Sequence, residues 1–242
     1  MGVAGQHEDF AWRAGAHPRR RRGAAGAHEL LPCPHGNAVV DQGVGEGTGA
    51  LRRLDREQTG RSGRFLMTDA LPVDDREALI AALRQGRGAG ARLPRIRLDG
   101  ADLSGADLTE ARLSGANLRG ANLSGAVLRG AFLDGADLSE ADCRGANLEF
   151  AVLGGATLTR TGFQDAVLRR ANLVGASGAE ARFDGADLYY ARPGNANFAG
   201  AVFRDALVQR AIFRRANLAS ADFTGAEGQA NFENANLTGM RR

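Results

Sequence analysis

The sequence contains no lysine, few aromatic residues and only two cysteines. All 31 basic side chains are arginine, aromatic residues make up 6% of the chain, and 34 of the 242 residues are glycine. This composition argues against a globular core built on large side chains. Cys33 and Cys143 lie in unrelated contexts and suggest no disulfide framework, so nothing in the sequence indicates an oxidising compartment.

Signals for membranes and secretion are also missing from the sequence. No apolar run has the length of a membrane-spanning helix, and no apolar segment follows the arginines at 19–22. Gln6 stands where N-myristoylation requires Ser or Thr. We therefore expect a cytoplasmic protein without a membrane partner.

The formal net charge is only +3, so its distribution matters more than its sum. Arginine suits bidentate contacts with anions, which would explain its abundance by a binding role. We prefer the alternative explanation, a genome that favours Arg, Ala and Gly codons. Residues 96–242 carry 16 arginines and 17 acidic residues. A nearly neutral domain does not favour a basic groove, so direct nucleic-acid binding is not expected.

Residues 1–66 lack a sustained hydrophobic period, and we expect them to be disordered because they cannot bury enough apolar surface. Two interpretations of this segment stay open. The arginines at 19–22 could tether an anion or a nucleic acid. Alternatively, the sharp change in pattern at Met67 indicates that translation starts there.

Residues 67–95 predict a short amphipathic helix and a lead-in to the next domain. Asp74, with Glu77 three residues later, resembles a capping box, and Gly86 offers a C-terminal stop. Because the open end of a solenoid exposes core side chains and strand edges, we expect this helix to act as the N-terminal cap. Its apolar face consists of Leu79, Ile80 and Leu83.

From Ile96 the sequence divides into units of five residues. The first 26 units run without a break to Gly225; their first residue is Ala in 24, and their third is Leu in 16 and Phe in six. A four-residue unit at 226–229 shifts the frame, and two further units end at Gly239. A period of five fits neither a helix nor an alternating strand, but it fits a coil with four short sides.

In such a coil the first and third residues of each unit face the axis, and the other three face water. Gly is the fifth residue in 13 of the 26 units, as expected for a turn that needs a positive φ angle. Four units depart at the inward third position, which we interpret as packing defects: Cys143, Gly178, Pro193 and Val208. The expected core ladder includes Leu103, Leu108, Leu113, Leu118, Leu123, Phe163, Phe183, Phe203 and Phe223.

The recurring pattern A-(D/N)-L-x-x resembles the pentapeptide-repeat family, and the resemblance covers residues 96–239. It implies an all-β fold, a right-handed quadrilateral β-helix of about seven coils, followed by a short tail at 240–242. From the residues themselves we expect a binding scaffold with no cofactor.

The residues offer little support for an enzyme, a metal site or a small-molecule substrate. All four histidines precede Met67, and Cys143 replaces an inward Leu, where a cysteine usually acts as a small apolar side chain. His28, Cys33 and His35 are weak candidates for metal ligands. Acidic residues at the second position of a unit face outward on a regular lattice. We therefore expect no catalytic residue.

The outward columns predict a contact surface, because residues 20 apart stack on the same face of adjacent coils. Aromatic side chains beside Arg are typical of protein interfaces, although single exposed apolar residues mean little. We expect a protein partner or self-association there. The candidate residues are Phe150, Arg169, Arg170, Tyr189, Tyr190 and Arg210, with Phe132 and Val152 on the neighbouring side.

The favoured function is therefore a non-enzymatic interaction module of unassigned partner. The family resemblance adds an alternative, since some members protect DNA gyrase and resemble duplex DNA in size and negative charge. Residues 96–159 carry nine acidic residues against five Arg, but 160–242 carry 11 Arg against eight, which is a poor mimic. Gyrase-protecting members also dimerise through their C-terminal coils, and Phe232 and Leu237 in an uncovered last coil predict the same here.

Overall fold

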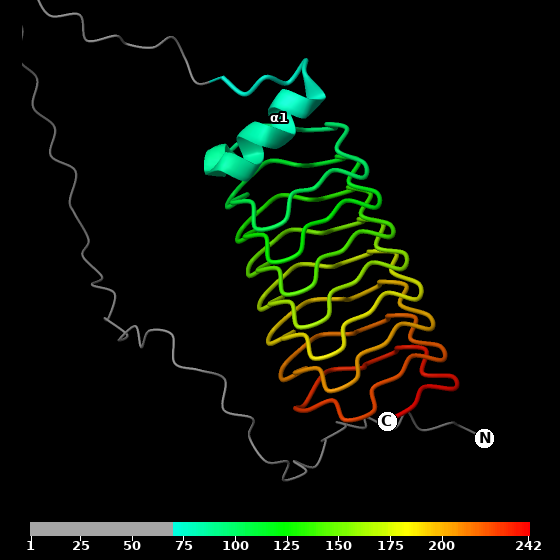
Figure 1. The fold of residues 1–242 in the computed structure, drawn as a ribbon. Coiled ribbons are helices and arrows are strands. Elements are labelled where there is room, and N and C mark those ends of the chain that lie inside the picture. Colours follow the sequence, from blue (N-terminus) through cyan, green and yellow to red (C-terminus); the bar gives the residue numbers. More distant parts are fainter. Residues whose placement is uncertain (1–69) are drawn as a thin grey trace, which may run out of the picture. The chain divides into compact units, whose positions relative to one another are not determined.

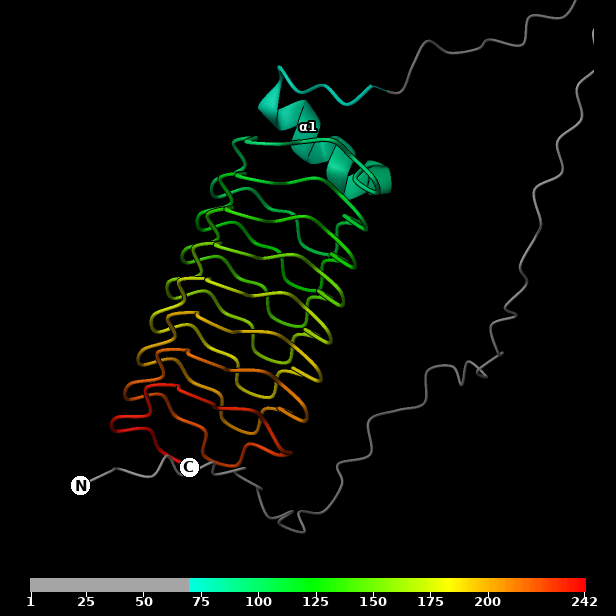
Figure 2. The ribbon, with the colours of Figure 1, turned by 180° about the vertical axis from the view of Figure 1, so that it is seen from behind.

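The computed structural model describes residues 70–242. These residues contain one α-helix, α1 (Arg76–Ala82), which continues into a π-helical turn, η1 (Leu83–Arg87). The rest winds into a stack of four-sided coils, and α1 lies across the N-terminal end of the stack (Figures 1 and 2). The disorder expected for 1–66, the arginine tether and a start at Met67 all lie outside the described residues.

Backbone hydrogen bonds between successive coils hold the stack together, and they form isolated parallel bridges between residues 20 apart. In most units the third residue donates to the next coil, as the Leu103 amide does to the Asn122 carbonyl at 2.7 Å. The fifth residue donates in the same direction, as Gly105 does to Ser124 at 2.9 Å. The chain is therefore a β-helix in which each side of a coil is too short for a conventional strand.

The coil extends beyond both boundaries that the sequence pattern suggested. Its first bridge joins Arg92 to Arg112, and Leu93 is only 2% exposed, so the unit 91–95 belongs to the coil and not to a lead-in. At the other end Arg241 is bridged to Asp222, so residues 240–242 continue the coil and do not form a separate tail.

The core is a ladder of third-position side chains, with small alanines at the first position filling the space beside them. The nine ladder residues named from the sequence are all 0% exposed. Four of them, Phe163, Phe183, Phe203 and Phe223, stack with ring centroids 5.0, 4.7 and 4.5 Å apart and nearly parallel planes. The core thus changes from Leu to mainly Phe along the axis, at constant register.

Gly178 is not a packing defect, which corrects the interpretation from the sequence. A Cβ atom on Gly178 would lie 2.3 Å from Cε1 of Phe198, so the Phe198 ring occupies the volume that a Leu at 178 would fill. Cys143, one coil before Phe163, is also fully buried. At Gly178 and Phe198 a small and a large residue on adjacent coils therefore compensate each other.

Two other irregularities change the backbone hydrogen bonding between coils. Pro193 has no amide hydrogen, and within the described coils no bridge joins Arg192 to Ile212, where the register would place one. Past Glu227 the bridge spacing drops from 20 to 19 residues, as the four-residue unit requires. Gly228 makes this short side possible, since a Cβ there would lie 2.6 Å from the Gln209 amide nitrogen.

Helix α1 begins one residue later than the capping box predicted. Asp75, not Asp74, is the N-cap, and its Oδ1 accepts a hydrogen bond from the Ala78 amide at 3.1 Å. The capping box is wrong because Ala78, which has no carboxylate, occupies the third helical position. Leu79 and Ile80 of α1 and Leu83 of η1 belong to the same buried cluster as the coil, and Arg84 of η1 pairs with Asp102 at 3.1 Å.

Candidate functional site: an Arg–aromatic corner

One corner of the coil gathers the outward aromatic side chains. We define the Arg–aromatic corner by three columns of residues that recur every 20 positions. The fifth-position column is Gly90, Glu110, Gly130, Phe150, Arg170, Tyr190 and Arg210; the fourth-position column is Thr109, Arg129, Glu149, Arg169, Tyr189 and Gln209. The second-position column, on the next side of the coil, is Arg92, Arg112, Phe132, Val152, Asn172, Arg192 and Ile212.

The turn at the end of each unit fixes where these side chains stand. In the turn that contains Phe150, the Ala151 amide donates to the Leu148 carbonyl at 3.0 Å, and Phe150 has φ = 61°. Arg170, Tyr190 and Arg210 likewise have φ of 57°, 56° and 61°. A positive φ suits Gly, and bulky residues adopt it at a cost, so the fold holds four large side chains in a conformation that none prefers.

The fifth-position column alternates aromatic rings with guanidinium groups. The Cζ atom of Arg170 lies 5.5 Å from the ring centroid of Phe150 and 5.9 Å from that of Tyr190. Arg129 lies 5.6 Å from the Phe150 centroid, and Arg210 lies 5.1 Å from that of Tyr190 and donates to its hydroxyl. Each of these two rings is thus contacted by one Arg from the preceding coil and by one from the following coil.

The fourth-position column adds ion pairs beside this stack. Arg129 pairs with Glu149 at 3.3 Å, and Arg169 pairs with Asp187 at 3.1 Å while lying 5.2 Å from the Tyr189 ring centroid. Tyr189 and Tyr190 meet edge to face, with centroids 4.7 Å apart. The two columns are therefore joined by ring contacts into one surface.

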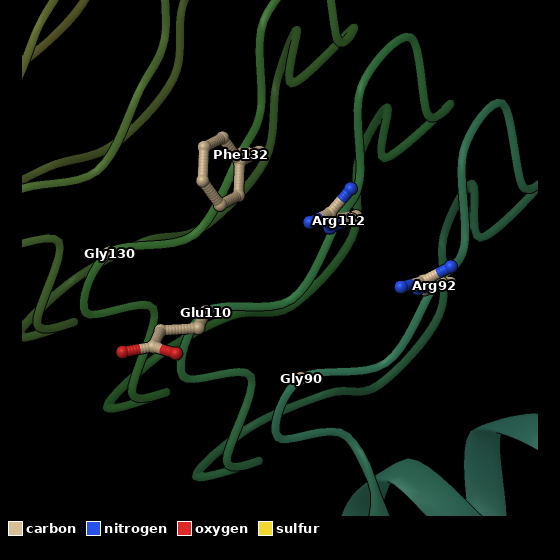
Figure 3. Close-up of a pocket in the computed structure, with 6 residues that line it drawn as sticks. All are labelled: Gly90, Arg92, Glu110, Arg112, Gly130 and Phe132. Carbon is tan, nitrogen blue, oxygen red and sulfur yellow. The ribbon is translucent and has the colours of Figure 1, made fainter. Parts of the chain in front are cut away.

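The second-position column borders a shallow pocket of about 450 Å³ near the N-terminal end. Figure 3 shows Arg92, Arg112 and Phe132 on successive coils, with Glu110 in the neighbouring column between Gly90 and Gly130. The two glycines leave the pocket open because they place no side chain in it. The Arg112 guanidinium lies 5.8 Å from the Phe132 ring, which is 41% exposed.

The corner differs from the rest of the coil in charge and in aromatic content. Its three columns carry seven arginines and two glutamates, whereas residues 96–242 as a whole are nearly neutral. All four outward aromatic side chains of the described residues are here: Phe132, Phe150, Tyr189 and Tyr190. Arg and aromatic residues are enriched at the energetic centres of protein interfaces.

Elsewhere on the coil, Asp and Asn side chains accept hydrogen bonds from backbone amides. Asp and Asn at the second position accept a hydrogen bond from the amide two residues on, as Asp107 does from Thr109 at 3.0 Å. Hydrogen bonds from Thr224 and from Arg204 lower the pKa of Asp222 to about 2, and those from Thr109 lower the pKa of Asp107. These carboxylates stabilise turns, which accounts for them without a catalytic role.

Cys143 and the candidate metal ligands of the described residues can be examined one by one. Cys143 is fully buried, and burial raises the pKa of its thiol far above the usual range, which suppresses the reactive thiolate. Across 70–242 no cluster of three His, Cys, Asp or Glu side chains could hold a metal ion. No helix in this range has the length and apolar character to cross a membrane. The metal-ligand candidates His28, Cys33 and His35 lie outside the described residues.

The N-terminal part of this surface does not follow from the repeat pattern that begins at Ile96. The structure brings together all eight candidate surface residues, but it also adds Arg92, Arg112 and the pocket between them and Glu110. A repeat that begins at Ile96 leaves Arg92 in the lead-in and outside the column. The unit 91–95 reads Ala-Arg-Leu at its first three positions, and that signal could have placed Arg92 in the column.

The comparisons with known proteins agree with this architecture. The family profile described as pentapeptide repeats, in eight copies, matches residues 89–120, 116–155, 163–192 and 195–227. No curated protein matches the chain.

Several solved structures are similar. HetL, a pentapeptide repeat protein involved in heterocyst differentiation regulation from Nostoc sp. strain PCC 7120, is 29% identical, with 65% of this chain and 93% of that chain covered and a TM-score of 0.34. A pentapeptide repeat protein of the Arabidopsis thaliana thylakoid lumen is 36% identical over 40% and 65%, with a TM-score of 0.34. QnrB1, a plasmid-mediated fluoroquinolone resistance protein, is 24% identical over 64% and 85%, with a TM-score of 0.36. On the profile match and the five-residue register together, this chain belongs to the pentapeptide repeat family, with the right-handed β-helix of that family.

Proposed function

We propose that this protein is a non-enzymatic interaction module that binds a protein partner through the Arg–aromatic corner. The observation that carries the proposal is the continuous stack of Phe150, Arg170, Tyr190 and Arg210, each in contact with the next. Large amphipathic side chains of this kind supply most of the binding energy in typical interfaces.

The stack also reduces the cost of binding. Free arginine side chains lose considerable rotamer entropy when a partner immobilises them. Here Arg170 is held between two rings and Arg210 is held by the ring and hydroxyl of Tyr190, so part of that entropy is already lost in the free protein. A preorganised surface of this kind favours specific recognition over non-specific binding.

Protection of a topoisomerase by DNA mimicry receives less support. A mimic of duplex DNA needs negative charge along the faces that contact the enzyme. The most distinctive outward surface of this coil instead carries seven arginines against two glutamates. We therefore keep the interaction module of unassigned partner as the favoured function.

We also propose that two copies associate through the last coil. Leu237 and Met240 are half-buried there, whereas Leu218, one coil earlier in the same column as Leu237, is fully buried. Apolar side chains and strand edges at a coil end favour pairing with an identical end, which covers both.

Site-specific photo-cross-linking in cells tests the partner proposal. A photoreactive phenylalanine analogue replaces Tyr190 in the full chain, and in a matched control it replaces Arg160, a fifth-position residue with the same φ of about 57° outside the corner. We expect a discrete heterologous protein adduct from position 190 and none from position 160. The adduct should disappear when Phe150→Ala and Arg170→Ala are added. Equal adducts from both positions would contradict the proposal.

A further inference from the structure

The arginines of the corner are short of carboxylate partners. Arg129 and Arg169 form ion pairs with Glu149 and Asp187. The remaining five have no carboxylate within ion-pair distance among residues 70–242: Arg92, Arg112, Arg170, Arg192 and Arg210. Elsewhere on the coil six arginines form ion pairs with acids, namely Arg119, Arg144, Arg160, Arg182, Arg204 and Arg214, whereas Arg95, Arg97, Arg215 and Arg241 form none with the described residues. Unmatched positive charge is therefore concentrated at the corner, although not confined to it, and this favours an anionic ligand there.

The arrangement of the rings indicates which kind of anion fits. Phe150 is contacted by Arg129 and Arg170, and Tyr190 by Arg170 and Arg210, so guanidinium groups already occupy the positions against these rings. Single-stranded nucleic acid binds such platforms by stacking bases on free ring faces. A guanidinium stacked on a ring still presents its N–H edge, which matches a carboxylate in bidentate geometry. The corner therefore suits carboxylates better than bases.

The pocket adds an apolar contact at the N-terminal end of the corner. Phe132 is contacted by Arg112 from the preceding coil and is otherwise 41% exposed, next to Val152 on the following coil. Arg92 and Arg112 stand one coil apart in the same column (Figure 3). A segment that places a carboxylate on this pair can lay an apolar side chain on Phe132.

The length of the corner sets the length of the ligand. Arg92 and Arg210 lie about six coils apart, which at about 4.8 Å per coil is roughly 29 Å. An extended peptide rises about 3.3 Å per residue, so about nine residues span this distance.

A single acidic side chain of the fifth-position column, Glu110, faces the pocket and opposes carboxylates there.

We propose that the Arg–aromatic corner binds an extended acidic segment of a partner protein, about nine residues long, with carboxylates on the five arginines that lack acidic partners and an apolar side chain on Phe132. This inference rests on the proposed function and specifies the chemistry of the partner. It also assigns a role to Glu110, which limits the affinity for an acidic ligand and selects against a carboxylate at that point of the segment.

Fluorescence anisotropy with the full chain tests the inference. The probe is a labelled nonapeptide of alternating Glu and Leu, and the comparison peptide has Gln in place of every Glu. We expect the Glu peptide to bind at least about tenfold more tightly, and its affinity to fall between about 50 and 200 mM sodium chloride. No binding of the Glu peptide at low salt would overturn the inference.

Three variants connect the binding to the named residues. Arg92→Ala with Arg112→Ala should weaken binding of the Glu peptide about tenfold. The control pair Arg119→Ala and Arg160→Ala removes the same charge outside the corner and should change it less than about twofold; an equal loss in both pairs would reduce the effect to net charge and overturn the site. Glu110→Gln should strengthen binding, an outcome that a misfolded variant cannot produce.

A labelled oligouridylate of about ten nucleotides separates the two classes of anion. If it binds more tightly than the Glu peptide, and Arg92→Ala with Arg112→Ala abolishes that binding, the ligand is a nucleic acid and the inference is wrong. The cross-linking experiment at position 190 stands apart from these measurements. A protein adduct there without binding of the Glu peptide would keep the proposed function and remove only the acidic segment.

Discussion

At the scale of single residues, the protein balances side-chain volume between adjacent coils and not within one. Gly178 faces the axis with no side chain, and the ring of Phe198 from the next coil fills its place. Thr161, which replaces an inward Ala, is fully buried and donates its hydroxyl hydrogen to the Leu138 carbonyl at 2.8 Å. A substitution at an inward position therefore affects residues of the adjacent coil.

A double-mutant cycle measures this coupling. Gly178→Ala places a Cβ atom 2.3 Å from the Phe198 ring, and we expect it to lower the free energy of unfolding by about 1–3 kcal/mol. In a Phe198→Leu background the same change should cost far less, because the ring is absent. Urea unfolding of the four proteins, followed by circular dichroism, gives the coupling. Additive effects would show that the two positions do not share one volume.

At the scale of the five-residue element, Asp or Asn at the second position of many units closes the turn by accepting a hydrogen bond from the amide two residues on. Asp222 is the most perturbed example: hydrogen bonds from Thr224 and Arg204 lower its pKa to about 2. Because the pKa in the folded protein lies below the unfolded value of about 3.9, this interaction stabilises the fold above pH 4. The contribution is lost as the pH falls from about 4 towards 2.

The pH dependence of unfolding tests this turn. The unfolding midpoint of the wild-type protein should decrease between about pH 5 and 2, and Asp222→Asn should decrease less over the same range. Asp134→Asn is a suitable control, because its carboxylate accepts from the Ser114 side chain and closes no turn of its own unit. Parallel profiles for wild type and Asp222→Asn would contradict the assignment.

Much of the element and its repetition could be predicted from the sequence, because a period of five with Ala and Leu at fixed positions admits few folds. The family and the β-helix follow from that pattern. Other details depend on distances between coils, which no local pattern contains. The filling of Gly178 by Phe198 is one, and the pocket beside Arg112 is another. The local signal places the N-cap at Asp74, which has Glu77 three residues later, whereas the structure uses Asp75, which has Ala78 there.

At the scale of the whole coil, the C-terminal end carries its own prediction. Leu237→Arg places a charge among half-buried apolar side chains and should convert a dimer into a monomer, since two like charges would meet at a symmetric interface. Sedimentation velocity of wild type and variant checks this. Thr238→Arg, a fully outward position in the same unit, is the control. A wild-type protein that sediments as a monomer would remove the proposed association.

The predicted binding at the corner depends on the whole Arg–aromatic surface and not on one residue. The 20-residue register allowed Phe150, Arg170 and Tyr190 to be placed in one column from the sequence. What the sequence could not supply was the mutual contact of these side chains, which converts scattered outward residues into a single stack.

The register of 20 residues also restricts how the gene of such a protein can change in length. Deletion of one whole coil, such as residues 131–150, would shorten the stack and leave every remaining column aligned. Deletion of a single unit of five would preserve the core pattern but rotate all that follows by a quarter turn. Arg92 and Arg112 would then face one direction and Tyr190 another. Insertions and deletions that keep the fold but lose the partner should therefore be those that are multiples of five and not of 20.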